Sequence, residues 1–130
     1  MSGKNAVGLG SCVLLALLVA PPASAGVVNG VLSQWNLQVK ECKDGQIDLG
    51  AMVNVGMFEA VNRIAGKYTP YLPGTPVRGT GSMEAAAATA AHDVLVALCP
   101  DQAEGFAGAL KSSLAEVKDA KAREAGAKVG

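Results

Sequence analysis

The side chains that could carry out chemistry in this 130-residue chain are few and far apart. The only histidine, His92, stands beside Asp93 in an alanine-rich stretch with helical spacing. A histidine next to a carboxylate can act as a general base. A lone histidine on such a helix is more often a structural hydrogen-bonding residue, and we interpret His92 in this way.

A metal site is the next chemistry to consider, because Cys42, His92 and Cys99 are all potential ligands. Zinc sites use several His, Cys or carboxylate ligands at characteristic spacings, and these three residues do not form such a pattern. His92 and Cys99 are seven positions apart, or two turns along one helix face, which is too far for both to reach one ion. The sequence therefore predicts no metal-binding residue.

Serine and carboxylate chemistry is also weakly supported. Ser82 lacks the glycine pattern and the preceding strand of a nucleophile elbow, so we interpret it as a helix cap. Glu59 and Asp93 could face each other, but acids on helix surfaces are usually solvated. The segment 74–81 lacks the Gly-Lys-Ser/Thr ending of a phosphate-binding loop. We therefore predict no catalytic and no cofactor-binding residue.

The first 25 residues have the pattern of a secretory signal peptide. A short basic region with Lys4 precedes an apolar run from Ala6 to Ala20, and small residues at 23–25 offer a cleavage site before Gly26. The apolar run is shorter than the roughly 20 residues that cross a bilayer. We expect an exported protein, periplasmic or extracellular, with residues 1–25 as signal peptide and 26–130 as one helical domain. No stable membrane anchor is expected after cleavage.

Removal of the first 25 residues would leave two of the three cysteines, Cys42 and Cys99. Export would place them in an oxidising compartment, where a disulfide can persist. A bridge between them would stabilise the fold by roughly 2–4 kcal/mol if the geometry permits it. Alternatively, both thiols are free and fill small apolar spaces, since Cys99 closes a strongly apolar run. The sequence leaves both alternatives open.

Apolar residues recur at helical spacing almost throughout the domain, and no stretch alternates as a strand does. Helices are predicted at about residues 27–39, 48–65, 83–98 and 100–117, with a last one from 119. The third should be a buried central helix, and its short connection to the fourth predicts an antiparallel hairpin. The expected fold class is all-α, a small bundle of about four to five helices.

Particular side chains are expected at particular places in this bundle. Met52 should lie on the buried side of the second helix, where Gly56 allows a neighbouring helix to come close. The prolines and glycines of residues 67–81 exclude a regular element, and we expect Tyr68, Tyr71 and Leu72 to pack this loop.

The charges argue against a nucleic-acid partner. The chain has 11 basic and 11 acidic residues and a net charge of zero. Binding to a phosphate backbone needs a concentrated basic face, whereas these cations are scattered among acids, and aromatic residues are too few for a stacking platform.

Several segments, taken in order, resemble the N-terminal helical part of bacterial vanadium-dependent haloperoxidases, which share their core with type-2 phosphatidic acid phosphatases. In order, these segments are Trp35-Asn36 after a short apolar helix, AMVNVGMFEAVNRI, the corner KYTPYL, EAAAATAAHDVLVALCP, the following helix with Leu110 and Leu114, and the final KAREAGAKVG. Together they cover nearly all of the chain after the signal peptide. Family members often have His where Asn54 stands and Asp where Glu59 stands, and these departures leave the helical scaffold intact.

The resemblance implies a larger helical protein that holds vanadate, or phosphate in the phosphatases, with Lys, Arg and His residues located downstream of this region. No residue of this chain matches those motifs, so none is assigned a role, and no cofactor is expected in this chain. We expect an exported scaffold segment that is truncated before the catalytic motifs, whose parent oxidises halides with peroxide. Its partner would be the missing C-terminal part or a second copy.

Two other functions remain open at this stage. A phosphatase-type relative would need a downstream continuation that encodes the cationic pocket. A small exported helical interaction module without activity would need none. A fragment of a larger bundle should expose an apolar surface on its second and third helices.

Overall fold

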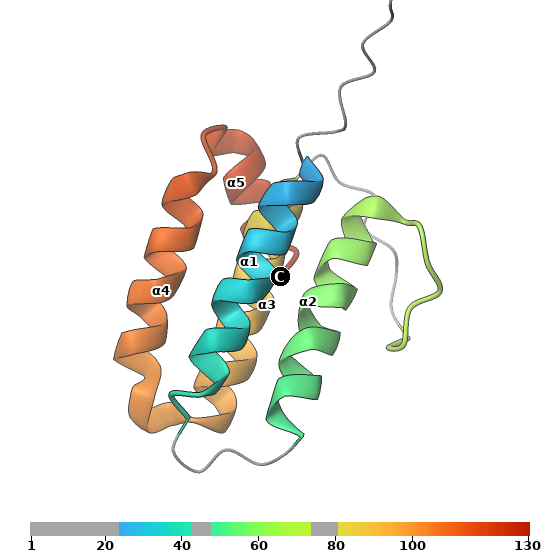
Figure 1. Ribbon diagram of the computed structural model, residues 1–130. Coiled ribbons are helices and arrows are strands. Elements are labelled where there is room, and N and C mark those ends of the chain that lie inside the picture. Colours follow the sequence, from blue (N-terminus) through green and yellow to red (C-terminus); the bar gives the residue numbers. More distant parts are fainter. Residues whose placement is uncertain (1–23, 43–47, 74–80) are drawn as a thin grey trace, which may run out of the picture.

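The computed structural model describes residues 24–42, 48–73 and 81–130, and in these ranges the chain forms helices and short connections without a strand (Figure 1). The helices are α1 (Ser24–Val39), α2 (Leu49–Ala65), α3 (Met83–Leu98), the 3-10 helix η1 (Pro100–Gln102), α4 (Ala103–Glu116) and α5 (Ala120–Ala127). The predicted all-α bundle is confirmed. The apolar run of the expected signal peptide and most of the segment 74–81 lie outside the described residues.

The four long helices run alternately in opposite directions, and α5 lies across one end of the bundle (Figure 1). Helix α3 packs against α1, α2, α4 and α5, so it occupies the centre. Helix α4 follows α3 through η1 and runs back along it, as the short connection predicts. No helix in the described ranges is both long and apolar enough to span a bilayer.

Alanine makes the central position of α3 possible. Ala85, Ala86, Ala87, Ala88 and Ala91 are fully buried. Small side chains allow neighbouring helices to approach closely, and most of the larger apolar groups of the core come from those neighbours. The largest fully buried side chains are Trp35, Phe106, Met57, Leu95 and Val53.

Glycines mark places where other helices come close to α3. A Cβ atom at Gly56 of α2 would lie 3.2 Å from Cγ2 of Val94, which confirms that this position admits a close neighbour. A Cβ atom at Gly126 of α5 would overlap the carbonyl oxygen of Ser82. Since Ser82 N also donates to Ala122 O at 2.8 Å, α5 is seated directly on the N-terminal end of α3.

The helix ends follow ordinary capping chemistry. Ser82 Oγ accepts a hydrogen bond from Ala85 N at 3.1 Å, so the predicted cap is confirmed. Asp119 caps α5 by accepting from the amides of Lys121 and Ala122. Gly66 ends α2 in the left-handed conformation at φ 59°.

Some expectations were wrong in detail. Helix α1 begins at Ser24, three residues before the expected start at Val27. Pro100 does not start an α-helix but a 3-10 turn, since the chain must reverse tightly between α3 and α4. Met52 is 41% exposed, because it lies on the edge of α2 that neither α1 nor α3 covers.

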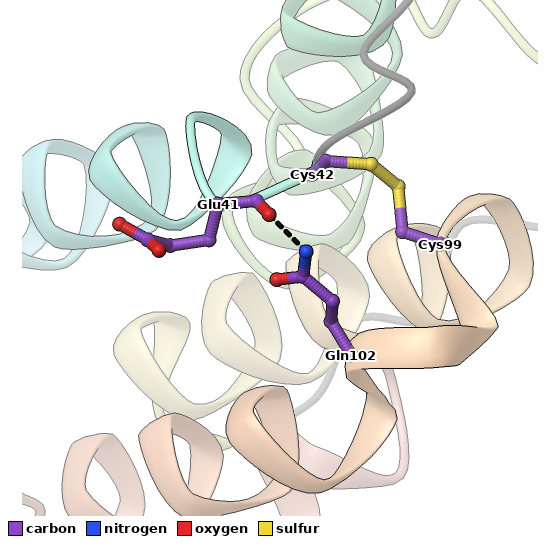
Figure 2. The surroundings of a disulfide bond; sticks show 4 residues. All are labelled: Glu41, Cys42, Cys99 and Gln102. Atoms are coloured by element: carbon purple, nitrogen blue, oxygen red, sulfur yellow. Dashed lines mark hydrogen bonds between the residues drawn. A yellow bond between two sulfur atoms is a disulfide. The ribbon is translucent and has the colours of Figure 1, made fainter.

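A disulfide joins Cys42, just after α1, to Cys99, at the end of α3 (Figure 2). Their Cα atoms are 5.9 Å apart, which is a normal spacing for such a bridge. Beside it, the side-chain amide of Gln102 donates to the carbonyl oxygen of Glu41. The structure therefore decides between the two open alternatives in favour of the bridge.

Candidate functional site

His92 lies on α3, with its ring beside Trp35 of α1. Its Nδ1 lies 2.8 Å from Oδ1 of Asp93, and its ring meets the ring of Trp35 edge-on at a centroid distance of 6.5 Å. The His92 side chain is 19% exposed and borders an open groove of about 600 Å³ that Lys111 and Arg123 also line. The Arg123 guanidinium donates to the carbonyl oxygen of Val117 at 2.9 Å, so part of its bonding capacity fixes the start of α5.

The other ligand candidates lie elsewhere. Cys42 and Cys99 are bonded to each other, so neither offers a thiol for metal binding or nucleophilic attack. Among the residues that the structure describes, no group of three or more His, Cys, Asp or Glu side chains is arranged to hold a metal ion. Ser82 is engaged as the cap of α3 and also donates to Glu84 Oε2 at 2.7 Å.

Glu59 differs from the surface acid that we expected. It is only 5% exposed, and its Oε1 accepts hydrogen bonds from the backbone amides of Tyr71 at 2.5 Å and Leu72 at 3.3 Å. The prediction of a solvated Glu59 was wrong because the chain after α2 folds back over this carboxylate. Asp93, whose side chain is 63% exposed, bonds to His92 instead, so the two acids have separate partners.

Asn62, one turn further along α2, holds the same segment and was not singled out by the sequence. Its Oδ1 accepts from the amides of Lys67 at 3.2 Å and Tyr68 at 2.8 Å, while its Nδ2 donates to Tyr68 O at 2.7 Å. The side chain is buried, with 6% exposure. The sequence did contain a pattern that could have indicated this role. An asparagine stands four positions before Gly66, and a corner that contains a proline follows.

Together these two buried side chains fix a short segment whose own side chains face outward. Tyr68 is 63% exposed, Tyr71 is 76% exposed and Leu72 is 54% exposed. We call these three residues the aromatic corner. The expectation that they pack the loop internally was wrong, because hydrogen bonds to the backbone, rather than burial of these side chains, hold the segment in place.

The aromatic corner adjoins an apolar depression between α1 and α2, which we call the hollow. The hollow has a volume of about 270 Å³. Its lining consists of Leu32, Asn54, Met57, Phe58, Val61, Asn62, Ala65 and Tyr68. Phe58 belongs to both features, because it lines the hollow while its ring lies 5.6 Å from the ring of Tyr71 and 6.2 Å from that of Tyr68.

A pair of amide side chains links the two helices beside the hollow. Asn54 Nδ2 donates to Asn36 Oδ1 at 2.8 Å, and Asn36 Nδ2 donates to Asn54 Oδ1 at 3.2 Å. Each Nδ2 also donates to a carbonyl one turn back, Leu32 O for Asn36 and Gly50 O for Asn54. The pair therefore cross-links α1 to α2 without introducing a charge.

Charge is distributed unevenly between this side and the rest of the bundle. Helix α1 contains no charged residue, and α2 contains only Glu59 and Arg63. The final helix is different, since Lys128 and Glu124 form an ion pair at 2.8 Å on its exposed surface. The hydrogen bond and charge of Lys128 lower the pKa of Glu124.

We call the hollow and the aromatic corner together the α1–α2 face. The residues that line the hollow carry no charge, and most of them are apolar. Comparisons of the chain with models of protein families, with curated proteins and with solved structures found no match.

Proposed function

We propose that this chain is an exported helical scaffold segment of the haloperoxidase-like type, not catalytic on its own, which works by presenting the α1–α2 face to another helical polypeptide. The observation that carries the proposal is the aromatic corner. Two buried polar side chains, Glu59 and Asn62, hold its backbone while its apolar side chains remain in solvent.

Exposed apolar side chains of this kind contribute little to the stability of the bundle itself. Burial of a tyrosine or leucine side chain stabilises a fold by a few kcal/mol, and this gain is forgone where the side chain stays outside. A rigid exposed aromatic group loses little conformational freedom when a partner covers it, which favours binding. Tyrosine is also among the residues that contribute most to protein interfaces.

The resemblance to haloperoxidases adds support of a different kind. The segments that carry it form α2, the aromatic corner, α3 and the end of the chain. The side chains with chemical potential in the described ranges are engaged structurally: His92 with Asp93, Ser82 in a cap and the cysteines in a bridge. These observations favour a scaffolding role over a catalytic one.

Binding of a hydrophobic dye such as anilinonaphthalene sulfonate at low protein concentration tests the proposal. We expect dye fluorescence from a protein that still unfolds cooperatively, because the α1–α2 face is open in a folded molecule. Ala65→Asp should reduce this fluorescence by at least about half, because it places a charge in the hollow at an exposed position that lies outside the core.

Leu98→Asp provides the matched control. Leu98 is 47% exposed and lies at the end of α3 beside the disulfide, away from the α1–α2 face. This variant should bind dye as the parent does. A cooperatively folded protein that binds no dye when it is dilute would contradict the proposed function.

A further inference from the structure

We infer that the partner of the α1–α2 face is a second copy of this chain, arranged about a two-fold axis so that Tyr71 and Leu72 of each copy enter the hollow of the other. The inference rests on the proposed function, because it names what covers the face proposed there. Three observations carry it: the shape of the face, its exposed area and its lack of charge.

The shape is self-complementary. A two-fold interface brings the same surface of both molecules together, so a projection on that surface must meet a recess on the same surface. The aromatic corner projects, with Tyr71 76% exposed, and the hollow of about 270 Å³ lies directly beside it. Because Phe58 contacts the Tyr71 ring and also lines the hollow, projection and recess share one face.

The exposed area is of the right order. An aromatic side chain presents about 150–250 Å² when fully accessible, so the two tyrosines together offer on the order of 300 Å². A standard interface buries roughly 800 Å² on each partner. The two tyrosines alone therefore supply roughly a third of the area that one partner buries.

The lack of charge permits a contact between identical surfaces. When two copies meet about a two-fold axis, charges close to the axis lie near their own equivalents, and like charges repel. Helix α1 carries none, and the acid of α2 nearest the aromatic corner, Glu59, is buried under backbone amides. The only charged residue within the corner segment is Lys67, whose Nζ lies 5.8 Å from the centroid of the Tyr68 ring.

Sedimentation equilibrium tests the inference. The sample is the protein as purified after expression, with whatever processing the cell has carried out. We expect a monomer–dimer equilibrium between low micromolar and millimolar concentration, with dye binding falling as the dimer forms. Tyr71→Asp should weaken dimerisation on the order of 30-fold or more, because loss of an interface anchor has an effect of this size. Leu98→Asp should leave it unchanged.

A mixing experiment separates this geometry from unspecific association. Ala65→Phe fills the hollow and should also abolish the dimer, while the milder Ala65→Leu serves if the larger side chain disturbs folding. Neither Tyr71→Asp nor Ala65→Phe alone retains a working contact. An equimolar mixture should regain association, because the intact corner of the Ala65→Phe copy fits the open hollow of the Tyr71→Asp copy.

The outcomes also distinguish the two proposals. A protein that binds dye but stays monomeric at every concentration overturns the second-copy inference and leaves the proposed function standing. A dimer that tolerates Tyr71→Asp also overturns the inference, because its contact must then lie elsewhere. Absence of both dye binding and association in a folded protein contradicts the proposed function itself.

Discussion

Glu59 shows how one buried carboxylate can organise a surface. A carboxylate is rarely buried without partners, and here the backbone amides of Tyr71 and Leu72 supply them. Because one carboxylate oxygen accepts both hydrogen bonds, the two amides are held in place. The position of the aromatic corner thus depends on a residue that is itself hidden from any partner.

Replacement of this residue gives a prediction at the residue scale. Glu59→Ala should lower the free energy of unfolding by about 1 kcal/mol, a moderate effect because the released amides can turn to water. The Tyr71 and Leu72 amides should lose protection in hydrogen exchange, whereas those of α3 should not. Glu59→Gln, which keeps an acceptor oxygen, should behave close to the parent. Unchanged exchange at Tyr71 in the alanine variant would refute this role.

At the scale of elements, the contact between α5 and α3 depends on the absence of a side chain. Gly126→Ala should destabilise the protein by about 1–3 kcal/mol, because the new methyl group would overlap the Ser82 carbonyl and push α5 away. Gly108 of α4 provides the control, since a Cβ atom there meets nothing within 4 Å. Gly108→Ala should raise stability by up to about 1 kcal/mol, as measured by urea unfolding. Equal effects of the two substitutions would count against close packing of α5.

The disulfide provides a second prediction about elements. Cys42 and Cys99 are 57 positions apart, and cross-linking a loop of this length restricts the unfolded chain by an amount equivalent to about 4 kcal/mol. The double variant Cys42→Ala, Cys99→Ala should therefore unfold at a clearly lower urea concentration. A loss of stability below about 1 kcal/mol would mean that the bridge adds little to the packing of α1 and α3.

The helical elements were predictable from the sequence because their cause is local. Apolar spacing placed α2 and α3, and Ser82 and Gly66 marked ends that the structure confirms. The burial of Glu59 and the outward direction of Tyr71 were not predictable. They depend on where the chain goes after α2, which no periodicity encodes. Similarly, spacing alone could not decide whether Cys42 and Cys99 meet, since the answer depends on how α1 packs against α3.

At the scale of the whole molecule, the distribution of charge separates two sides. The side formed by α1 and α2 is nearly free of charge, whereas the sequence from Glu116 to Lys128 carries charges of both signs at short intervals. A surface with mixed charges keeps a protein soluble, while an uncharged apolar one favours association. The difference in charge between the two sides agrees with the proposal that a partner binds the α1–α2 face.

The whole chain also allows a test of activity. We expect no bromination when the purified protein is incubated with vanadate, peroxide and bromide, because its single imidazole is paired with Asp93 and borders an open groove. Stabilising a multiply charged oxyanion requires several preorganised donors around one position. Turnover above that of a heat-denatured sample would contradict the scaffold role.

The bridge between Cys42 and Cys99 also determines what happens when the backbone is cut. The aromatic corner lies between the two cysteines in the sequence, and its side chains are exposed. A protease that cleaves there produces two polypeptides that remain covalently joined, so the nicked protein keeps its mass on a non-reducing gel. The two pieces separate only after a reductant opens the bridge. Cleavage in the corner is therefore visible on a reducing gel and not on a non-reducing one.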